Sequence, residues 1–152
     1  MPVDIRLESY NSEVVQRLIQ SMADDLAKFY GPASYPPQDP TLWAPPRGAV
    51  LAAYLEGEPV ACGAIIAFDA QTAEVKRMFT RPEYRRQGIA AAILATLEGT
   101  ARQLGYRRLV LETGVPQTAA QAFYERRGFS RLECWPPHDM DPTSLCYGRD
   151  LI

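Results

Sequence analysis

The sequence predicts a mixed α/β fold for its 152 residues. Short segments with alternating or continuous apolar residues, typical of strands, are interspersed with segments whose apolar residues recur at helical spacing. Glycine and proline residues mark the boundaries between these segments, and no internal repeat or change in composition divides the chain. A chain of this length forms one sizeable core, so we expect a single domain spanning residues 1–152.

The first expected elements are a strand and a long helix. Residues 3–8 alternate apolar and polar side chains, as a half-buried strand does. Apolar residues then recur at helical spacing from Val14 to Leu26, and Asn11-Ser12 can cap the helix that they predict. Gly31-Pro32 is expected to end this helix. Six of the 13 prolines fall between residues 32 and 48, so we expect no regular structure there.

The centre of the chain predicts three strands and a second helix. Two apolar segments, residues 49–55 and 60–68, flank a short polar loop and are typical of a hairpin. A third strand is expected over residues 73–80. Isoleucine and leucine residues follow at helical spacing between residues 87 and 104, which predicts a helix.

The last part of the chain predicts a strand, a short helix and two further strands. The strand covers residues 108–113, and the helix covers residues 118–127. The final strands are expected at residues 129–134 and 145–151, separated by a second proline-rich loop at residues 136–142.

Charge and hydropathy exclude two classes of partner. The formal net charge is -2, so no global field draws the protein to nucleic acid or to an anionic membrane. No apolar run approaches the roughly 20 residues that span a bilayer. The first residues also lack the basic and apolar regions of a signal peptide. We therefore expect a cytoplasmic protein with no membrane or nucleic-acid partner.

The three cysteines, Cys62, Cys134 and Cys146, are widely spaced. Their spacing does not form a metal-ligand cluster and does not suggest a disulfide framework. We expect free thiols that are buried or half-buried, and no bound metal.

Residues 85–90, with the sequence Arg-Arg-Gln-Gly-Ile-Ala, lie between a predicted strand and a predicted helix. Free N–H groups at a helix N-terminus and the helix dipole favour an anion there. Gly88 and Ala90 lack bulky side chains, so a phosphate can approach the backbone, and Arg85 and Arg86 add charged donors. By itself this segment fits an exposed basic turn that caps a helix equally well. The glycine patterns of P-loop and dinucleotide-binding proteins are absent from the sequence.

Two segments together resemble the GCN5-related N-acetyltransferase (GNAT) superfamily. The Arg-x-x-Gly-x-Ala pattern of residues 85–90 resembles the first signature of the family, and residues 75–84 resemble its fourth strand and turn. Residues 119–129, a helix with a tyrosine that ends in Gly-Phe, resemble its second signature. The resemblance covers about residues 49–129. It implies the GNAT fold, a mixed and mostly antiparallel central sheet of about seven strands flanked by about four helices.

The resemblance implies acetyl-CoA as cosubstrate. Its diphosphate would lie at residues 85–90, and backbone groups of the fourth strand would pair with the pantetheine arm and stabilise the carbonyl oxygen of the thioester. Gln117 stands where many family members have an asparagine that contacts the cofactor, and its longer side chain can make the same contact. The implied cofactor-binding residues are Met78, Phe79, Thr80, Arg85, Arg86, Gln87, Gly88, Ile89, Ala90, Gln117 and Tyr124.

Acetyl transfer to an amine needs a base and an acid. An alkylammonium group with a pKa of about 10.4 is only about one part in a thousand free base at neutral pH, so a carboxylate can assist. By resemblance Glu74 is the first candidate for this base, and Glu112 is its competitor. Tyr124 matches the tyrosine that protonates the departing thiolate in the family. The structural alternatives are a solvent-facing Glu74 paired with an arginine and a Tyr124 that only packs in the core.

By resemblance, the two proline-rich segments line the acceptor site. They contain aromatic and acidic residues that could hold a cationic amine by cation–π and Coulomb contacts. These residues are Tyr30, Tyr35, Asp39, Trp43, Trp135, His138, Asp139 and Asp141. Surface aromatics and solvated acids of ordinary loops explain the pattern equally well, and His138 has no evident partner for nucleophilic or metal chemistry.

Taken together, the sequence predicts an enzyme that moves an acetyl group from acetyl-CoA to the primary amine of a small molecule by direct attack on the thioester. A protein or peptide N-acetyltransferase is the first alternative. The second is a non-catalytic module that binds acyl-CoA as a sensor. Family members often dimerise, so a homodimer is also an expectation, although no segment indicates the interface.

Overall fold

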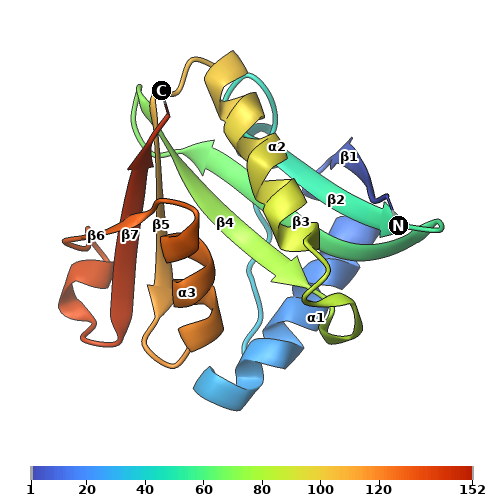
Figure 1. The fold of residues 1–152 in the computed structure, drawn as a ribbon, viewed down its shortest axis with the longest axis horizontal. Coiled ribbons are helices and arrows are strands. Elements are labelled where there is room, and N and C mark those ends of the chain that lie inside the picture. Colours follow the sequence, from blue (N-terminus) through green and yellow to red (C-terminus); the bar gives the residue numbers. More distant parts are fainter. Residues whose placement is uncertain (1, 152) are drawn as a thin grey trace.

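A seven-stranded sheet forms the centre of the molecule (Figure 1). The computed structural model describes residues 2–151. The strands are β1 (Asp4–Glu8), β2 (Ala49–Leu55), β3 (Glu58–Ala67), β4 (Thr72–Thr80), β5 (Arg108–Gly114), β6 (Ser130–Leu132) and β7 (Ser144–Asp150). They lie in the order β1-β2-β3-β4-β5-β7-β6, and only the β4–β5 pair is parallel. The predicted mixed, mostly antiparallel sheet is therefore confirmed.

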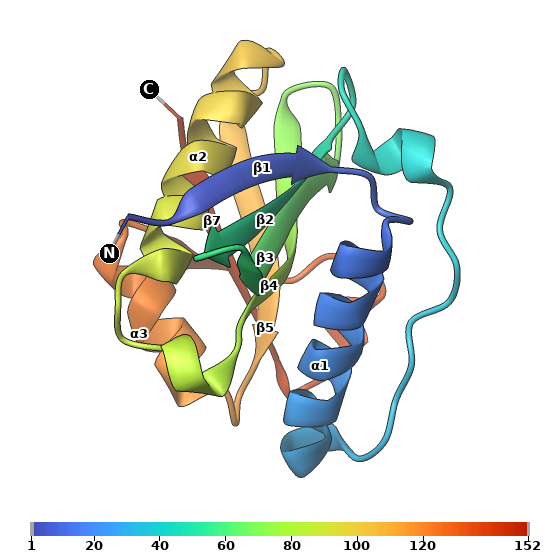
Figure 2. The ribbon, with the colours of Figure 1, turned by 90° about the vertical axis from the view of Figure 1, so that its right-hand side faces the viewer.

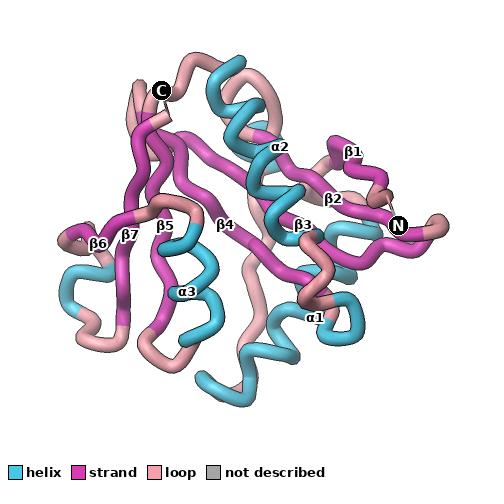
Figure 3. The backbone as a smooth tube through the Cα atoms, viewed as in Figure 1, coloured by secondary structure: helices cyan, strands magenta, loops and turns pink. Residues whose placement is uncertain are grey.

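Within residues 2–151, three α-helices cover the sheet, α1 (Glu13–Tyr30), α2 (Ile89–Gln103) and α3 (Thr118–Arg126). Helix α1 lies on one face, and α2 and α3 lie on the other (Figure 2). The expectation of about four helices is wrong. The segment of residues 32–48 holds six prolines, which lack an N–H donor and clash with a helical backbone. It runs as a loop (Figure 3) with one 3₁₀ turn, Pro40–Trp43.

Helix α1 follows the sequence pattern closely. The Ser12 hydroxyl accepts a hydrogen bond of 3.2 Å from the Val15 N–H and so caps the first turn. Gly31, with φ of 79°, ends the helix in a conformation that costs glycine little. The buried face, which includes Leu18 and Met22, packs in a core with residues of β2, β3 and β4. No helix of the described chain is long and apolar enough to cross a membrane.

Cys134 and Cys146 form a disulfide, so the expectation of free thiols is wrong for this pair. Strand β6 pairs with β7 so that Leu132 lies opposite Cys146. This pairing brings Cys134 to a Cα–Cα distance of 5.2 Å from Cys146, which is within reach of a disulfide. Spacing along the sequence does not show such a pairing. Cys62 is free and buried, as expected.

Gly63 lies where β3 passes beneath α2. A Cβ at this position would come within 2.5 Å of Met78 Sδ and 2.7 Å of Ile93 Cγ2. We expect Gly63→Ala to lower the free energy of unfolding by about 1–3 kcal/mol through overpacking, measured by chemical denaturation. The matched control is Gly99→Ala, since a Cβ on this helical glycine meets nothing within 4 Å and should stabilise by about 0.5–1 kcal/mol. Equal changes in the free energy of unfolding of the two variants would contradict the close packing of Gly63 against Met78 and Ile93.

Candidate active site

Strands β4 and β5 run side by side for only three residue pairs. Residues 72–74 pair with residues 108–110, and beyond Glu74 and Val110 the strands diverge (Figure 1). The outer edges of both strands stay paired, β4 with β3 and β5 with β7. The facing edges beyond the fork therefore present backbone N–H and C=O groups without a strand partner, which favours an extended ligand between them.

A cavity of about 340 Å³ occupies this fork. Residues of β4, β5, α1 and α3 line it, together with Tyr35 of the proline-rich loop. Its polar and charged lining residues are Tyr30, Tyr35, Glu74, Lys76, Arg77, Glu112, Thr113, Gln117 and Tyr124. The structure thus brings together both candidate bases, the candidate acid, Gln117 and Met78, whereas Phe79 and Thr80 do not line the cavity.

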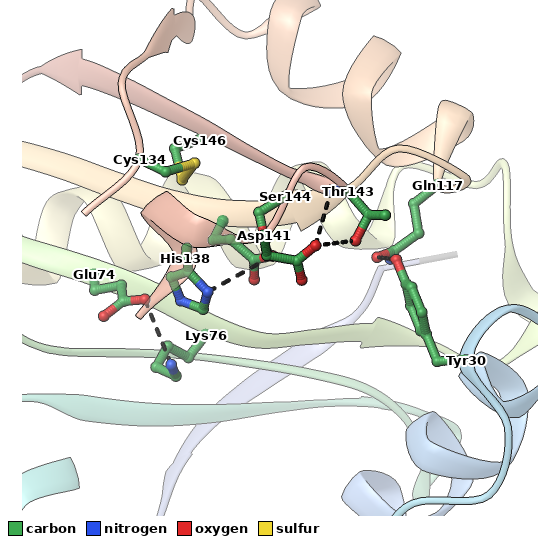
Figure 4. Close-up of polar contacts among 11 residues, drawn as sticks. Tyr30, Glu74, Lys76, Gln117, Cys134, His138, Asp141, Thr143, Ser144 and Cys146 are labelled. Carbon is green, nitrogen blue, oxygen red and sulfur yellow. Dashed lines mark hydrogen bonds and ion pairs between the residues drawn. A yellow bond between two sulfur atoms is a disulfide. The ribbon is translucent and has the colours of Figure 1, made fainter. Parts of the chain in front are cut away.

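Glu74 is the last residue of β4 that pairs with β5. Its side chain is buried, and its Oε2 accepts one long contact of 3.4 Å from Lys76 Nζ (Figure 4). The alternative of a solvent-facing Glu74 that pairs with an arginine does not describe this geometry. A buried carboxylate with one distant cation keeps lone pairs free for a proton or a substrate donor.

Glu112 faces the cavity from β5 and has two neighbours. Its Oε2 accepts a hydrogen bond of 2.9 Å from the Ser144 hydroxyl, and His138 Nδ1 lies 4.0 Å away. The sequence shows no evident partner for nucleophilic or metal chemistry at His138, and the structure adds Glu112 as its neighbour. The cause is tertiary, since the loop between β6 and β7 places His138 over β5 from 26 residues further along the chain. Of the two candidate bases, Glu112 therefore has more contacts with neighbouring polar side chains.

Tyr124 belongs to both the core and the cavity. Its ring packs edge-on against Phe123 and Phe129, with centroid distances of 5.2 Å and 5.6 Å. Among residues 2–151 its hydroxyl has no hydrogen-bond partner. Burial raises the pKa of Tyr124 above its usual range. The phenol therefore stays protonated at neutral pH and can donate a proton.

Gln117 and Tyr30 close one end of the cavity. The Tyr30 hydroxyl donates a hydrogen bond of 2.9 Å to Gln117 Oε1, which joins the end of α1 to the start of α3 (Figure 4). A Cβ on Gly114 would overlap the Tyr30 hydroxyl, so a larger residue there would displace the Tyr30 side chain from Gln117. The amide nitrogen of Gln117 keeps its two donors available to a ligand.

Thr113 is a cavity residue that no sequence pattern singles out. Its hydroxyl is buried in the cavity wall and has no partner within the described chain. Buried polar atoms are nearly always hydrogen-bonded, so this orphaned hydroxyl suits a ligand that occupies the fork. A threonine in a strand is common, and nothing in the sequence distinguished this one.

The N-terminus of α2 can bind an anion. Gly88 adopts a left-handed conformation with φ of 79°, and its carbonyl accepts the first helical bond, from the Ala92 N–H. The N–H groups of residues 89–91 therefore have no intrahelical acceptor and need other hydrogen-bond partners. A Cβ on Gly88 would meet nothing within 4 Å, so the approach to these groups is open. This geometry fits a diphosphate.

Arg85 and Arg86 have different surroundings. The Arg85 guanidinium donates to the Thr80 carbonyl at 2.9 Å and to Asp25 Oδ2 at 2.8 Å, which fastens the loop to α1. Arg86 is exposed and, in the described chain, has no ion-pair partner. Of the two arginines predicted at the diphosphate, Arg86 therefore has the freer charge.

We expect Arg86→Ala to raise the KM for acetyl-CoA about two- to fivefold, the effect of an exposed charge pair. The rise should shrink at high salt because the charge is screened. Arg85→Ala is the comparison and should mainly lower the melting temperature, since its contacts are with Thr80 and Asp25. Steady-state kinetics at two salt concentrations and thermal melting measure both effects. A larger KM change in Arg85→Ala would reverse the assignment.

A bulge in β4 shapes one wall of the cavity. The β3–β4 register shifts between Cys62 and Ala64, and Arg77 opposite this shift has φ of 59°. The Cys62 thiol donates a hydrogen bond of 3.2 Å to the Arg77 carbonyl. A left-handed non-glycine residue inside a strand is strained, and such strain gathers at functional sites. The adjacent basic pair Lys76-Arg77, unusual in an apolar strand, was the available signal.

The predicted acceptor residues do not all meet. Tyr30 and Tyr35 line the cavity, but Asp39, Asp139 and Asp141 do not. Asp39 accepts from the N–H and hydroxyl of Thr41, and Asp141 does the same with Thr143. The two carboxylates cap turns in their own loops. The carboxylates of the cavity are Glu74 and Glu112 instead.

The two remaining aromatic candidates have packing partners. Trp43 is buried and stacks on Tyr10, and Trp135 packs edge-on against Phe68.

In residues 2–151 no three His, Cys, Asp or Glu side chains gather in a way that could hold a metal ion. The absence of a metal cofactor stays a prediction.

The acetyltransferase (GNAT) family model matches residues 16–129. An IAA acetyltransferase from Azospirillum brasilense is 36% identical over 150 residues, which cover 98% of each chain. Among solved structures, a Klebsiella pneumoniae protein assigned to the acyl-CoA N-acyltransferases has a TM-score of 0.85 and 29% identity, covering 99% of this chain and 98% of that one.

A GNAT acetyltransferase from Elizabethkingia anophelis, solved with acetyl-CoA bound, has a TM-score of 0.73 at 19% identity and covers 98% of each chain. At that identity the likeness concerns the fold alone. The family match spans most of the chain, and the Azospirillum relative aligns over nearly its whole length. The chain therefore belongs to the GNAT family of acetyltransferases and is an acyltransferase enzyme.

Proposed function

We propose that the enzyme moves an acetyl group from acetyl-CoA to the primary amine of a small molecule, by direct attack of the amine on the thioester. The observation that carries this proposal is the cavity in the fork between β4 and β5, with Glu74 and Tyr124 in its wall. Its volume of about 340 Å³ is in the range of small-molecule sites. A peptide acceptor would favour a longer, more open groove.

The chain offers a matching site for the cosubstrate. The open N-terminus of α2 and the exposed Arg86 suit the diphosphate. On the edge that faces the fork, residues 78–80 of β4 have no strand partner, and the Thr80 carbonyl there accepts from Arg85. This edge and the orphaned Thr113 hydroxyl suit the polar groups of an extended arm. Gln87, Ile89 and Ala90 complete the loop around the diphosphate. When bound, acetyl-CoA supplies an acetyl group activated as a thioester.

Glu74 is assigned the role of base. An ammonium acceptor must lose a proton before it can attack, and a carboxylate at the apex of the fork can receive that proton directly or through water. Glu74 has one distant partner, whereas Glu112 already accepts a hydrogen bond from Ser144 and lies beside His138. The freer carboxylate is the better acceptor for the proton of the amine.

Tyr124 is assigned the role of acid. Its buried phenol has a raised pKa, lines the cavity and has no competing hydrogen bond in the described chain. It can give its proton to a departing thiolate. The ring contacts with Phe123 and Phe129 hold the donor in one position, which favours catalysis by preorganisation.

The test is release of free CoA thiol from acetyl-CoA in a panel of amines, amino acids, aminoglycosides and peptides, read with a thiol reagent. Burial raises the pKa of the Cys62 thiol to about 12, so this thiol should not react with the reagent in the native enzyme. We expect turnover with small amines. Turnover with peptides alone would favour the protein acetyltransferase, and tight binding of acetyl-CoA without turnover would favour the sensor.

A further inference from the structure

Arg77 is a cation on the cavity wall without a carboxylate partner. The cavity holds four charged side chains, Glu74, Lys76, Arg77 and Glu112. Lys76 lies 3.4 Å from Glu74. Glu112 is occupied by Ser144 and neighbours His138. Arg77 forms no ion pair with any residue in the described range 2–151. The charge of its guanidinium is therefore available to an anionic group of a ligand.

Aromatic rings hold the Arg77 guanidinium in place. It lies 4.2 Å from the centroid of Tyr35 and 5.0 Å from that of Trp43. Its Nε donates a hydrogen bond of 3.3 Å to the Tyr10 hydroxyl. Tyr10 and Trp43 are buried and stack on each other, so this support is rigid. A guanidinium has five N–H donors, and the terminal nitrogens have no hydrogen-bond partner among the described residues.

The backbone conformation of Arg77 is also unusual. Arg77 occupies the left-handed position of the β4 bulge. Such a conformation is strained for a non-glycine residue, and strain of this kind persists mainly where function uses it. A fixed, half-buried guanidinium with free terminal N–H groups is the usual partner of a planar oxyanion, above all a carboxylate.

We infer that the acceptor is a small molecule of the amino-acid class, with a carboxylate that Arg77 binds and an amine that faces Glu74. The inference rests on the proposed function and adds the substrate class. Glu74 and Arg77 lie three residues apart on one strand, so their Cα atoms are within about 10 Å of each other. An acceptor that meets both must carry its amine and its carboxylate close together, as an amino acid does.

The test compares each amino acid with the amine that lacks its carboxylate, such as tyrosine with tyramine, tryptophan with tryptamine and lysine with cadaverine. For the wild-type enzyme we expect kcat/KM to be about 10- to 100-fold higher for the preferred amino acid than for its amine, the value of hydrogen bonds to a charged group. The difference should lie mainly in KM. The amide of the same amino acid should behave like the amine.

Variants of Arg77 locate the effect. Arg77→Met keeps a long side chain over the aromatic rings but loses the charge, and it should bring the ratio of amino acid to amine close to one. Arg77→Lys should restore part of the ratio because it keeps the charge without the planar fork. Arg81→Met is the matched control, since Arg81 follows the same strand, contacts Pro59 and Ser21, and does not line the cavity. It should keep the wild-type ratio.

The outcomes separate the two proposals. Turnover of amines with no preference for their amino acids, or a preference that Arg77→Met leaves unchanged, would overturn the amino-acid class and leave N-acetylation of small amines standing. No turnover of either class by an enzyme that binds acetyl-CoA would overturn both. A preference that Arg77→Met abolishes and Arg77→Lys partly restores supports the inference.

Discussion

Replacing Tyr124 by phenylalanine is expected to lower kcat about 100-fold or more, the contribution of a positioned general acid. The change removes only the hydroxyl, which has no hydrogen-bond partner within residues 2–151. The ring keeps its contacts with Phe123 and Phe129, so the fold should survive. The KM for acetyl-CoA should change little, because the missing proton donor acts in the chemical step.

Tyr147→Phe is the matched control for Tyr124→Phe. Tyr147 is also buried, and its hydroxyl donates to Glu125 at 2.8 Å outside the cavity. Loss of that hydrogen bond should cost about 1 kcal/mol of stability with kcat nearly unchanged. Steady-state kinetics and thermal melting of both variants test the assignment. A Tyr124→Phe enzyme that turns over at the wild-type rate would reduce this tyrosine to a packing residue.

The pH dependence follows from the surroundings of Tyr124. Burial raises the pKa of this phenol above its usual value of about 10. As the proposed acid, Tyr124 acts in its protonated form, and that form is kept until pH exceeds the raised pKa. The wild-type kcat should therefore show no alkaline decline caused by Tyr124 below about pH 10. A pH profile of kcat with a saturating acceptor measures this.

Replacing Glu74 by glutamine is expected to lower kcat/KM at neutral pH about 100-fold. Without the base, the acceptor must arrive already deprotonated. The free-base fraction of an amine with a pKa of about 10.4 rises tenfold with each pH unit below that pKa. The deficit of Glu74→Gln should therefore narrow as pH rises toward 10, and a pH series of kcat/KM for both enzymes shows this directly.

Two comparisons make the Glu74 experiment decisive. Glu112→Gln alters the competing carboxylate and should have the smaller effect. If Glu112→Gln instead loses more kcat/KM than Glu74→Gln, and its deficit relative to the wild-type enzyme narrows as pH rises, Glu112 is the base. Lys76→Met removes the contact of 3.4 Å with Glu74 and shows how much of the Glu74→Gln effect comes from the broken ion pair. A uniform loss at all pH values would indicate displaced substrate and not a missing base.

Local patterns predicted most of the elements because they depend on near neighbours. Helix α1, expected between its Asn11-Ser12 cap and Gly31, spans Glu13–Tyr30 with Ser12 as the cap. Strand β2 has the predicted bounds, and α2 begins one residue after Gly88. The resemblance implied about four helices, whereas the described chain has three. The prolines of residues 32–48, where no regular structure was expected, leave only a 3₁₀ turn there.

The candidate site was predicted where it depends on a local motif. The turn at residues 85–90 needs only a glycine, a strand before it and a helix after it, and all of these are visible in the sequence. Its binding of a diphosphate stays a prediction. Glu74, Glu112 and Tyr124 reached the candidate set through the family resemblance. The structure places them around one cavity, while their catalytic roles await the variants described above.

The sequence by itself determined the order of the elements, the glycine-containing turn before α2 and the family. The tertiary structure decided which side chains meet. In it, β4 and β5 diverge after Glu74 and Val110, and Arg85 binds Asp25. His138 lies beside Glu112, and Cys134 forms a disulfide with Cys146. The tertiary structure also left Arg77 without a carboxylate among the described residues. These outcomes depend on strand register and on contacts between distant segments, and the periodicity of a single segment contains neither.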